Sequence, residues 1–252
     1  MQTLTPMTVD RSALHRIPEL GDELPKTMDY LQDVLGTLDC EVLFPLDSAV
    51  CAYFDFGAAD TLAFRAEMDA LPIAEQTGLP FSSQHSGKMH ACGHDFHAAM
   101  LLSAAKMLKE NESHLCGRVK FMFQPAEETF EGADNMIEHG ILENPKPDAA
   151  LAFHVTTGRS PVGTFMYNSK NTMMNSVDGF QITIHGKGSH GACPHQGIDP
   201  INIGVHIYLA LQELIARESN PANSCVLTIG RFCAGEVANI IPETAILQGT
   251  LR

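Results

Sequence analysis

The stretch HACGHDFHAAMLLSAAKML, His90–Leu108, joins a loop rich in metal-binding side chains to a strong helix signal. Asp95 is a good N-cap and Ala98–Leu108 is rich in helix-forming residues, so we expect a helix from Asp95 onward. Just before it, Cys92 and His94 lie two positions apart around a glycine, where a tight turn can direct both side chains at one ion. The stretch therefore predicts a loop-to-helix junction with a candidate metal site at its start.

Short apolar runs lie on both sides of this junction and predict strands that alternate with helices. The predicted elements are a helix over Asp22–Leu38, strands over Ala49–Phe56, Thr61–Met68, Arg118–Phe123 and Ala149–Phe153, and a helix over Gly132–His139. This β/α alternation favours an α/β fold with a mainly parallel sheet and helices on both faces.

The sequence pattern changes after about residue 168. Apolar and polar residues alternate over Val177–His185, as in a half-exposed strand, and a glycine-rich turn follows over residues 186–191. A helix over Pro200–Arg217 and strands over Cys225–Arg231 and Thr244–Leu251 complete a β-α-β-β order. That order is typical of a small α+β domain around a mainly antiparallel sheet. We therefore expect two domains, residues 1–172 and 173–252.

The composition argues against several classes of protein. The formal net charge of −14 disfavours binding to nucleic acid or to an anionic membrane, which needs clustered lysine and arginine. No apolar run approaches the ~18 residues of a membrane span, and no secretory signal is recognisable at the start. The seven cysteines are scattered without a Cys-x-x-Cys pair, which fits a reducing compartment. We expect a cytoplasmic protein without nucleic-acid or membrane partners.

Acidic and histidine residues follow the predicted strands at the points where they end. Asp69 follows the second strand, Glu127 and Glu128 follow the third, and His154 follows the fourth. Ligand sites of open α/β sheets gather at the carboxyl ends of their strands. These residues are therefore expected to lie close to the Cys92 turn.

The residue types at this expected site suit a divalent metal. Thiolate and imidazole ligands suit zinc, nickel or cobalt, and carboxylates extend the range to manganese. Adjacent glutamates can divide two tasks: one binds metal, and the other deprotonates a water whose pKa the metal lowers from ~15.7 toward ~7. Asp69 is placed to accept a hydrogen bond from a ligating imidazole. Together these features predict metal-assisted hydrolysis.

Each residue also has a purely structural interpretation when it is considered alone. His154 could be a core histidine, Glu127 and Glu128 a solvated pair, Cys92 a buried thiol, and Asp95 only a helix cap. It is their joint order at strand ends that favours the metal site.

Six stretches of the chain resemble the aminoacylase-like metallopeptidases, a family that includes hippurate hydrolases, indole-acetyl-amino-acid hydrolases and N-acetyl-diaminopimelate deacetylases. They are LHRIPEL (Leu14–Leu20), RAEMDALPI (Arg65–Ile73), MHACGHDFHAAMLL (Met89–Leu102), FQPAEETFEGADNMIEHG (Phe123–Gly140), GKGSHGACPHQGIDPI (Gly186–Ile201) and ANIIPETAILQGTLR (Ala238–Arg252). The resemblance covers nearly the whole chain.

The resemblance implies an oligomeric enzyme that removes an acyl group from an amino acid. A mainly parallel-sheet catalytic domain would hold two divalent ions of manganese, nickel, cobalt or zinc. A smaller, ferredoxin-like α+β lid domain would carry the homo-oligomer contact. The implied metal ligands are Cys92, His94, Glu128 and His154.

The resemblance also implies roles for the residues around the metal. Glu127 would be the general base and later the acid that protonates the leaving amine. His190 would stabilise the oxyanion, in some relatives across a dimer interface. Asn239 and Arg252 match lid residues that hold a substrate carboxylate, although a turn asparagine and a strand-end arginine are equally compatible with the sequence.

Family members continue beyond the point that matches Arg252, and the additional part normally supplies one more histidine ligand. We therefore expect this chain to be a fragment in which both domains are incomplete. Two alternatives to the amidohydrolase follow: an inactive fragment that only binds metal or a partner, and a dipeptidase or aminopeptidase with the same metal chemistry. The sequence does not distinguish the acyl group, the amino acid or the metal.

Overall fold

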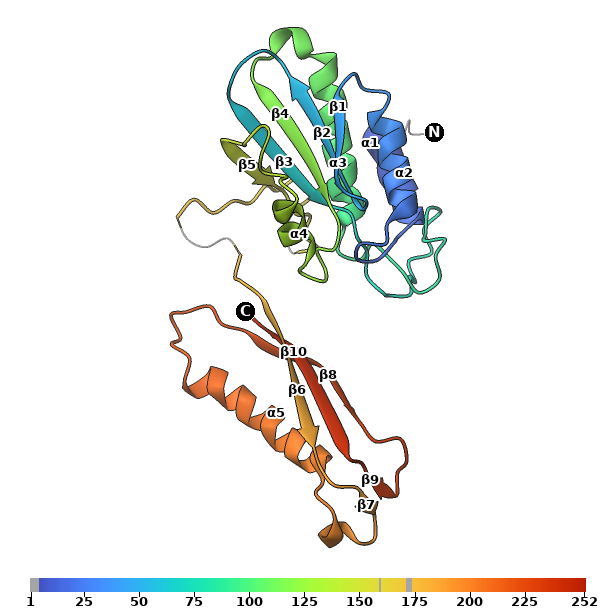
Figure 1. Cartoon of the computed structure of the whole chain (residues 1–252), viewed down its shortest axis with the longest axis vertical. Coiled ribbons are helices and arrows are strands. Elements are labelled where there is room, and N and C mark those ends of the chain that lie inside the picture. Colours follow the sequence, from blue (N-terminus) through green and yellow to red (C-terminus); the bar gives the residue numbers. More distant parts are fainter. Residues whose placement is uncertain (1–4, 159, 171–173) are drawn as a thin grey trace. The chain divides into compact units, whose positions relative to one another are not determined.

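The computed structural model describes residues 5–158, 160–170 and 174–252, and the chain forms two compact units. Unit 1 spans Met1–Arg159 and unit 2 spans Ser160–Arg252 (Figure 1). The domain boundary expected between residues 172 and 173 lies outside the described residues.

Unit 1 is built on a five-stranded sheet in the order β1-β2-β4-β3-β5. The strands are β1 (Glu41–Leu46), β2 (Ala49–Asp55), β3 (Thr61–Glu67), β4 (Arg118–Gln124) and β5 (Ala149–Ala152). β3 pairs in parallel with both β4 and β5, whereas β2 is antiparallel to β1 and to β4. Only β2 therefore runs against the others, and the expected mainly parallel sheet is confirmed.

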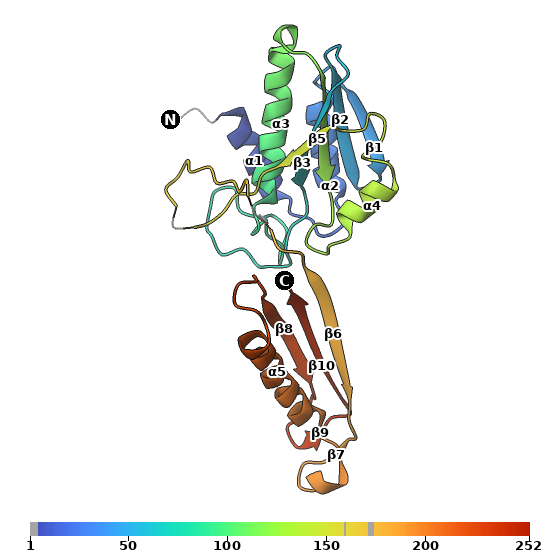
Figure 2. The same ribbon diagram turned by 90° about the vertical axis from the view of Figure 1, so that its left-hand side faces the viewer.

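Helices cover both faces of this sheet. They are α1 (Pro6–Arg16), α2 (Pro25–Leu35), α3 (His94–Glu110) and α4 (Gly132–Glu138), with a short 3-10 turn over Glu112–His114 after α3. Residues of α1, α2 and α3 share one buried cluster with Val50, Ala52 and Phe54 of β2. α4 lies on the opposite face of the sheet (Figure 2). There its Met136 packs with the alternate β2 residue Cys51. Successive strand residues point to opposite faces, so β2 is buried on both sides.

The start of α3 differs from the prediction in one respect. The helix begins at His94 and its N-cap is Gly93, which has a left-handed φ of 91°. The expectation that Asp95 caps this helix is therefore wrong. The Asp95 carboxylate lies within the first turn and pairs with the side chains of Arg11 and His15, both from α1. Neither α1 nor β1 was predicted from the sequence.

Unit 2 is a three-stranded antiparallel sheet with one long helix. The sheet order is β6-β10-β8, formed by β6 (Asp178–His185), β8 (Leu227–Ala234) and β10 (Thr244–Leu251). α5 (Pro200–Arg217) is capped by the Asp199 side chain, which accepts from the Ile201 and Asn202 N–H groups. This order matches the predicted β-α-β-β unit. Unit 2 also contains elements that were not predicted. They are a two-stranded ladder of β7 (Ser189–His190) with β9 (Ile240–Ile241) and a 3-10 turn over Pro194–Gln196.

Two further features concern the described residues as a whole. No helix among them has the length and apolar character that crossing a membrane requires. All seven cysteines are free thiols.

Candidate metal centre

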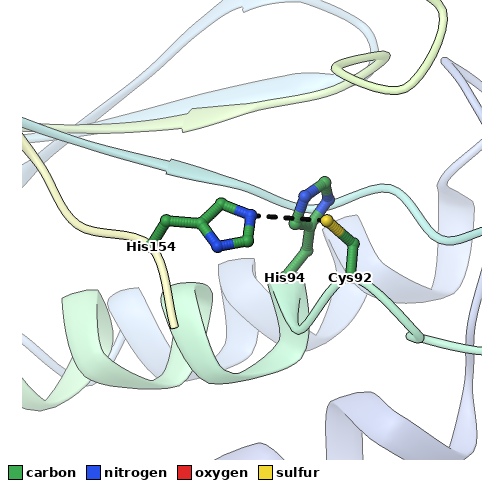
Figure 3. Close-up of side chains that lie close together, drawn as sticks. All are labelled: Cys92, His94 and His154. Carbon is green, nitrogen blue, oxygen red and sulfur yellow. Dashed lines mark hydrogen bonds between the residues drawn. The ribbon is translucent and has the colours of Figure 1, made fainter. Parts of the chain in front are cut away.

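Three segments of unit 1 bring candidate metal ligands together: the turn before α3, the loop after β4 and the segment after β5. Cys92 Sγ lies 3.3 Å from Nε2 of His154, with His94 beside them (Figure 3). From the loop after β4, the Glu127 and Glu128 carboxylates approach Nε2 of His94 to 3.7 and 3.9 Å. Two sets of candidate ligands, Cys92–His94–His154 and His94–Glu127–Glu128, therefore share His94.

The donor atoms of this cluster fit divalent metal ions. In each set they lie within 4.8 Å of one another. Nε2 of His94 and Oε1 of Glu128 are buried and have no hydrogen-bond partner among the described residues. A buried polar atom without a partner is costly, and a cation between these two atoms would satisfy both. One thiol, two imidazoles and two carboxylates are a donor set that borderline divalent metals prefer.

The electrostatics of the cluster also favour a cation. Burial and the negative charges of Glu128 and Glu127 raise the pKa of the Cys92 thiol to about 12. Burial likewise raises the pKa of Glu127, and the neighbouring Glu128 acts in the same direction. A divalent ion would lower these pKa values, because it favours the thiolate and carboxylate forms.

Asp69, two residues after the end of β3, orients two of the candidate ligands. Nδ1 of His94 donates to the Asp69 carbonyl oxygen at 2.8 Å, which fixes the tautomer and leaves Nε2 free to bind metal. Oδ1 of Asp69 lies 3.3 Å from the same nitrogen, and Oδ2 accepts from the Glu128 N–H at 3.0 Å. Burial disfavours the charged form of His94, but the hydrogen bond with Asp69 and the nearby carboxylates outweigh it and raise its pKa.

The loop that carries the two glutamates has an unusual backbone. Ala126 and Phe130, on either side of the pair, have positive φ values of 50° and 65°. The loop closes so tightly that a Cβ at Gly132 would lie 1.7 Å from the Pro125 carbonyl oxygen. Only glycine fits there. Backbone strain of this kind is concentrated at functional sites.

Beside the centre lies a buried pair that was not predicted from the sequence, Glu67 and His97. Nδ1 of His97 lies 2.8 Å from Oε2 of Glu67, and Arg65 forms an ion pair with the same carboxylate. Burial opposes ionisation of Glu67, but the His97 hydrogen bond and the Arg65 charge outweigh it and lower its pKa to about 2. Periodicity could have revealed both residues. Glu67, the last residue of β3, lies two positions before Asp69, and His97 lies one helical turn after His94.

A third buried network fixes the start of α3 from the other side. Asp95 Oδ2 lies 2.8 Å from Nε of Arg11 and 2.8 Å from Nδ1 of His15. Nε2 of His15 lies 3.2 Å from the Glu75 carboxylate, in the long loop between β3 and α3. The Arg11 guanidinium also stacks on the ring of Phe96, 4.3 Å from its centre. The network joins α1, the loop and the metal-site turn.

In unit 2, His190 and Asn239 lie next to each other. His190 is exposed in β7, and the Asn239 carbonyl accepts from the N–H of Gly191 at 2.8 Å. Arg252 lies beyond the opposite end of β10, where its backbone pairs with Val226. Eight strand residues at about 3.4 Å each separate the two ends by roughly 27 Å. A single unit 2 therefore does not bring Asn239 and Arg252 together, and the roles of these three residues remain predictions.

Comparison with known proteins places this cluster in a family. Residues 63–246 match Peptidase family M20/M25/M40. The chain is 40% identical over 245 residues to the N-acetyl-L-cysteine deacetylase of Bacillus subtilis (strain 168) and 39% identical over 244 residues to IAA-amino acid hydrolase ILR1-like 5 of Arabidopsis thaliana. These matches cover 96% of this chain in both cases. A solved Bacillus subtilis structure, a dinuclear metal binding peptidase from the M20 family, superposes with a TM-score of 0.72 at 37% identity.

The matches span only part of the relatives. The chain covers 58% of the Bacillus deacetylase, 55% of the Arabidopsis hydrolase and 63% of the solved peptidase chain, and 98% of this chain takes part in the last match. The matched range contains all the candidate ligands of the centre, and it confirms the resemblance found in the sequence. The chain belongs to peptidase family M20/M25/M40.

Proposed function

We propose that the protein is a metal-dependent amidohydrolase that hydrolyses the amide bond of N-acyl amino acids. One observation carries the proposal: the buried, unpartnered Nε2 of His94 and Oε1 of Glu128 lie beside the Cys92 thiol and the His154 imidazole. Cys92, His94, Glu128 and His154 would hold two divalent ions of manganese, nickel, cobalt or zinc. Asp69 would keep His94 and Glu128 in the binding geometry.

The names of the relatives support the substrate class. Similar proteins include a deacetylase of N-acetyl-L-cysteine, deacetylases of N-acetyldiaminopimelate and hydrolases of IAA-amino acids. In each of these compounds an acyl group is joined to the amine of an amino acid. We therefore infer a small N-acyl amino acid as substrate.

The chemistry that bound divalent ions supply is Lewis-acid chemistry, which lowers the pKa of water toward ~7 and polarises a carbonyl group. Glu127 would act as the general base that takes a proton from the attacking water, and would later give it to the leaving amine. The position of its carboxylate, 3.7 Å from Nε2 of His94, supports this role.

Unit 2 would act as the lid and carry the contact between subunits. His190 would stabilise the oxyanion, and Asn239 and Arg252 would hold the substrate carboxylate. A homo-oligomer formed through this unit is supported by exposed apolar side chains on α5, among them Val205, Tyr208 and Leu209. A cytoplasmic location belongs to the same proposal, supported by the free state of all seven cysteines.

The proposal is tested by metal removal and reconstitution. The chain would be stripped of metal, supplied with manganese, cobalt, nickel or zinc in turn, and assayed for bound metal and for hydrolysis. Substrates would be N-acetyl amino acids, hippurate and free-amine dipeptides in parallel. We expect metal-dependent release of free amino acid from the acylated compounds. Metal binding without turnover would favour the metal-binding fragment, and selective cleavage of dipeptides would favour the peptidase alternative.

A further inference from the structure

The hydrogen bonds of His97 define a single tautomer for its ring. Nε2 of His97 lies 2.9 Å from the backbone nitrogen of Val155. A backbone N–H can only donate, so Nε2 is the acceptor and carries no proton. The proton is therefore on Nδ1, which donates to Oε2 of Glu67 at 2.8 Å. Both ring nitrogens therefore have hydrogen-bond partners, and His97 is 2% exposed.

This assignment bears on a third cluster of possible metal ligands, Glu67–His94–His97. An imidazole that donates through one nitrogen and accepts through the other has no lone pair left for an ion. His97 therefore does not compete with His154 for metal. Its surroundings point to another task.

Val155, whose N–H donates to His97, packs between the segment that carries His154 and the turn that carries Cys92 and His94. Its Cγ2 would lie 2.5 Å from a Cβ at Gly93, so the valine packs directly on the turn between Cys92 and His94. The preceding residue is His154, whose Nε2 faces Cys92 Sγ at 3.3 Å (Figure 3). A shift of Val155 would therefore change the spacing between His154 and the turn.

The segment that carries His154 lies beyond the end of the sheet. β5 ends at Ala152, and residues 153–157 have no regular secondary structure. Ladder hydrogen bonds therefore do not fix the position of His154. The rings of His97 and His154 are in edge contact, with centres 4.5 Å apart. Hence His97 touches the segment twice, through the Val155 N–H and through the His154 ring.

We propose that His97, held by Glu67, is a positioning residue that fixes Val155 and so sets the separation of His154 from Cys92 and His94. One imidazole thereby links three elements that carry the centre: β3, α3 and the segment after β5. The consequence for metal binding rests on the function proposed above, whereas the effect on Val155 does not.

Two substitutions of His97 separate this role from general packing. In His97→Gln the side-chain amide reaches the position of Nε2, so an acceptor for the Val155 N–H is kept and the donor to Glu67 is lost. In His97→Asn the amide reaches only the position of Nδ1, so the donor to Glu67 is kept and the Val155 acceptor is lost. Both variants remove one ring from the same buried place. Their melting temperatures would serve as the check on folding.

Two measurements on the full chain would be compared. The first is hydrogen exchange of the Val155 amide by NMR in the metal-free protein. The second is Co²⁺ affinity, followed by the absorption of the thiolate–cobalt bond. We expect His97→Gln, which keeps the acceptor for Val155 and loses only the hydrogen bond to Glu67, to stay closer to the wild type than His97→Asn in both measurements. We expect His97→Asn to exchange Val155 faster and to lose about 10- to 100-fold in Co²⁺ affinity, the usual effect of losing a residue that orients ligands.

The outcomes distinguish this proposal from the proposed function. Equal exchange of Val155 in the two variants would overturn the positioning role, and so would equal Co²⁺ affinity despite different exchange. If the wild type itself bound no Co²⁺, the proposed function would fail. The exchange of Val155 alone would then decide whether His97 holds this segment.

Discussion

The carboxylate of Asp69 lies 3.3 Å from Nδ1 of His94, and the Asp69 carbonyl accepts a hydrogen bond from the same nitrogen. The other carboxylate oxygen accepts from the backbone N–H of Glu128. One fully buried residue thus orients an imidazole from α3 and a glutamate from the loop after β4. Because neither contact uses a metal-binding atom, Asp69 can arrange the centre before an ion arrives.

Replacing Asp69 by asparagine should weaken metal binding without unfolding the chain. An amide can still accept from the Glu128 N–H, but it no longer attracts the proton on Nδ1 of His94. We expect a loss of about 10- to 100-fold in affinity, measured by competition with a chelator. Asp47→Asn, at an exposed turn, is the matched control. Unchanged affinity in Asp69→Asn would show that His94 is oriented by the backbone alone.

Replacing Glu127 by glutamine should separate catalysis from metal binding. Glutamine has nearly the same shape but cannot take a proton from water. We expect hydrolysis of N-acyl amino acids to fall by ~10²-fold or more while metal content stays at the wild-type level. The exposed Glu131→Gln serves as the control. Normal turnover in the Glu127 variant would mean that another residue is the base.

Replacing Lys120 by methionine should destabilise unit 1. The Lys120 side chain is buried, and Nζ donates to the carbonyl oxygens of Ile141, Glu143 and Pro145 at 2.9, 2.7 and 3.0 Å. Burial lowers the pKa of this amine. Its hydrogen bonds to the three carbonyl oxygens offset part of the free-energy cost of burying it. Without the amine they are left unsatisfied. We expect the free energy of unfolding in urea to fall by roughly 2–5 kcal/mol.

The surface substitution Lys109→Met provides the comparison for Lys120. Lys109 pairs with Asp39 and Glu112 on the exterior, where water replaces a lost partner. We expect a much smaller effect on urea unfolding. Equal losses in the two variants would contradict a specific role for Lys120 in holding the loop before β5.

Replacing His15 by glutamine should change how stability depends on pH. The hydrogen bond with Asp95 raises the pKa of His15 above its ordinary value of 6.5. The stabilisation by His15 is therefore complete below that value and is lost as pH rises through the folded-state pKa. Asp95 and Glu75 have lowered pKa values, because their hydrogen bonds outweigh the effect of burial. Their contribution to stability therefore persists down to more acidic pH.

Urea unfolding of the metal-free protein at several pH values measures this dependence. We expect the free energy of unfolding of the wild type to exceed that of His15→Gln most between about pH 4.5 and 6.5. The difference should shrink at higher pH. The exposed His114→Gln should show no such window. A constant difference across the pH range would mean that His15 acts by packing rather than by charge.

Most elements of both units could be predicted from local sequence. The predicted strand over Thr61–Met68 is observed as Thr61–Glu67, and the helix over Pro200–Arg217 has the predicted bounds. These segments carry their own signals, an apolar run in one and a proline start after an aspartate cap in the other. α1 carries a weaker local signal, because its buried residues include Asp10 and His15 as well as Leu14.

The sequence by itself determined the family, the mainly parallel sheet and the group of side chains at its strand ends. It could do so because hydrophobic periodicity and motif spacing are local properties. Only the tertiary structure decided which side chains of the site contact one another. Asp95 binds α1 instead of capping α3, His97 joins β3 to the segment of His154, and Asn239 lies far from Arg252. Each is a contact or separation between residues distant along the chain, which packing fixes and spacing does not encode.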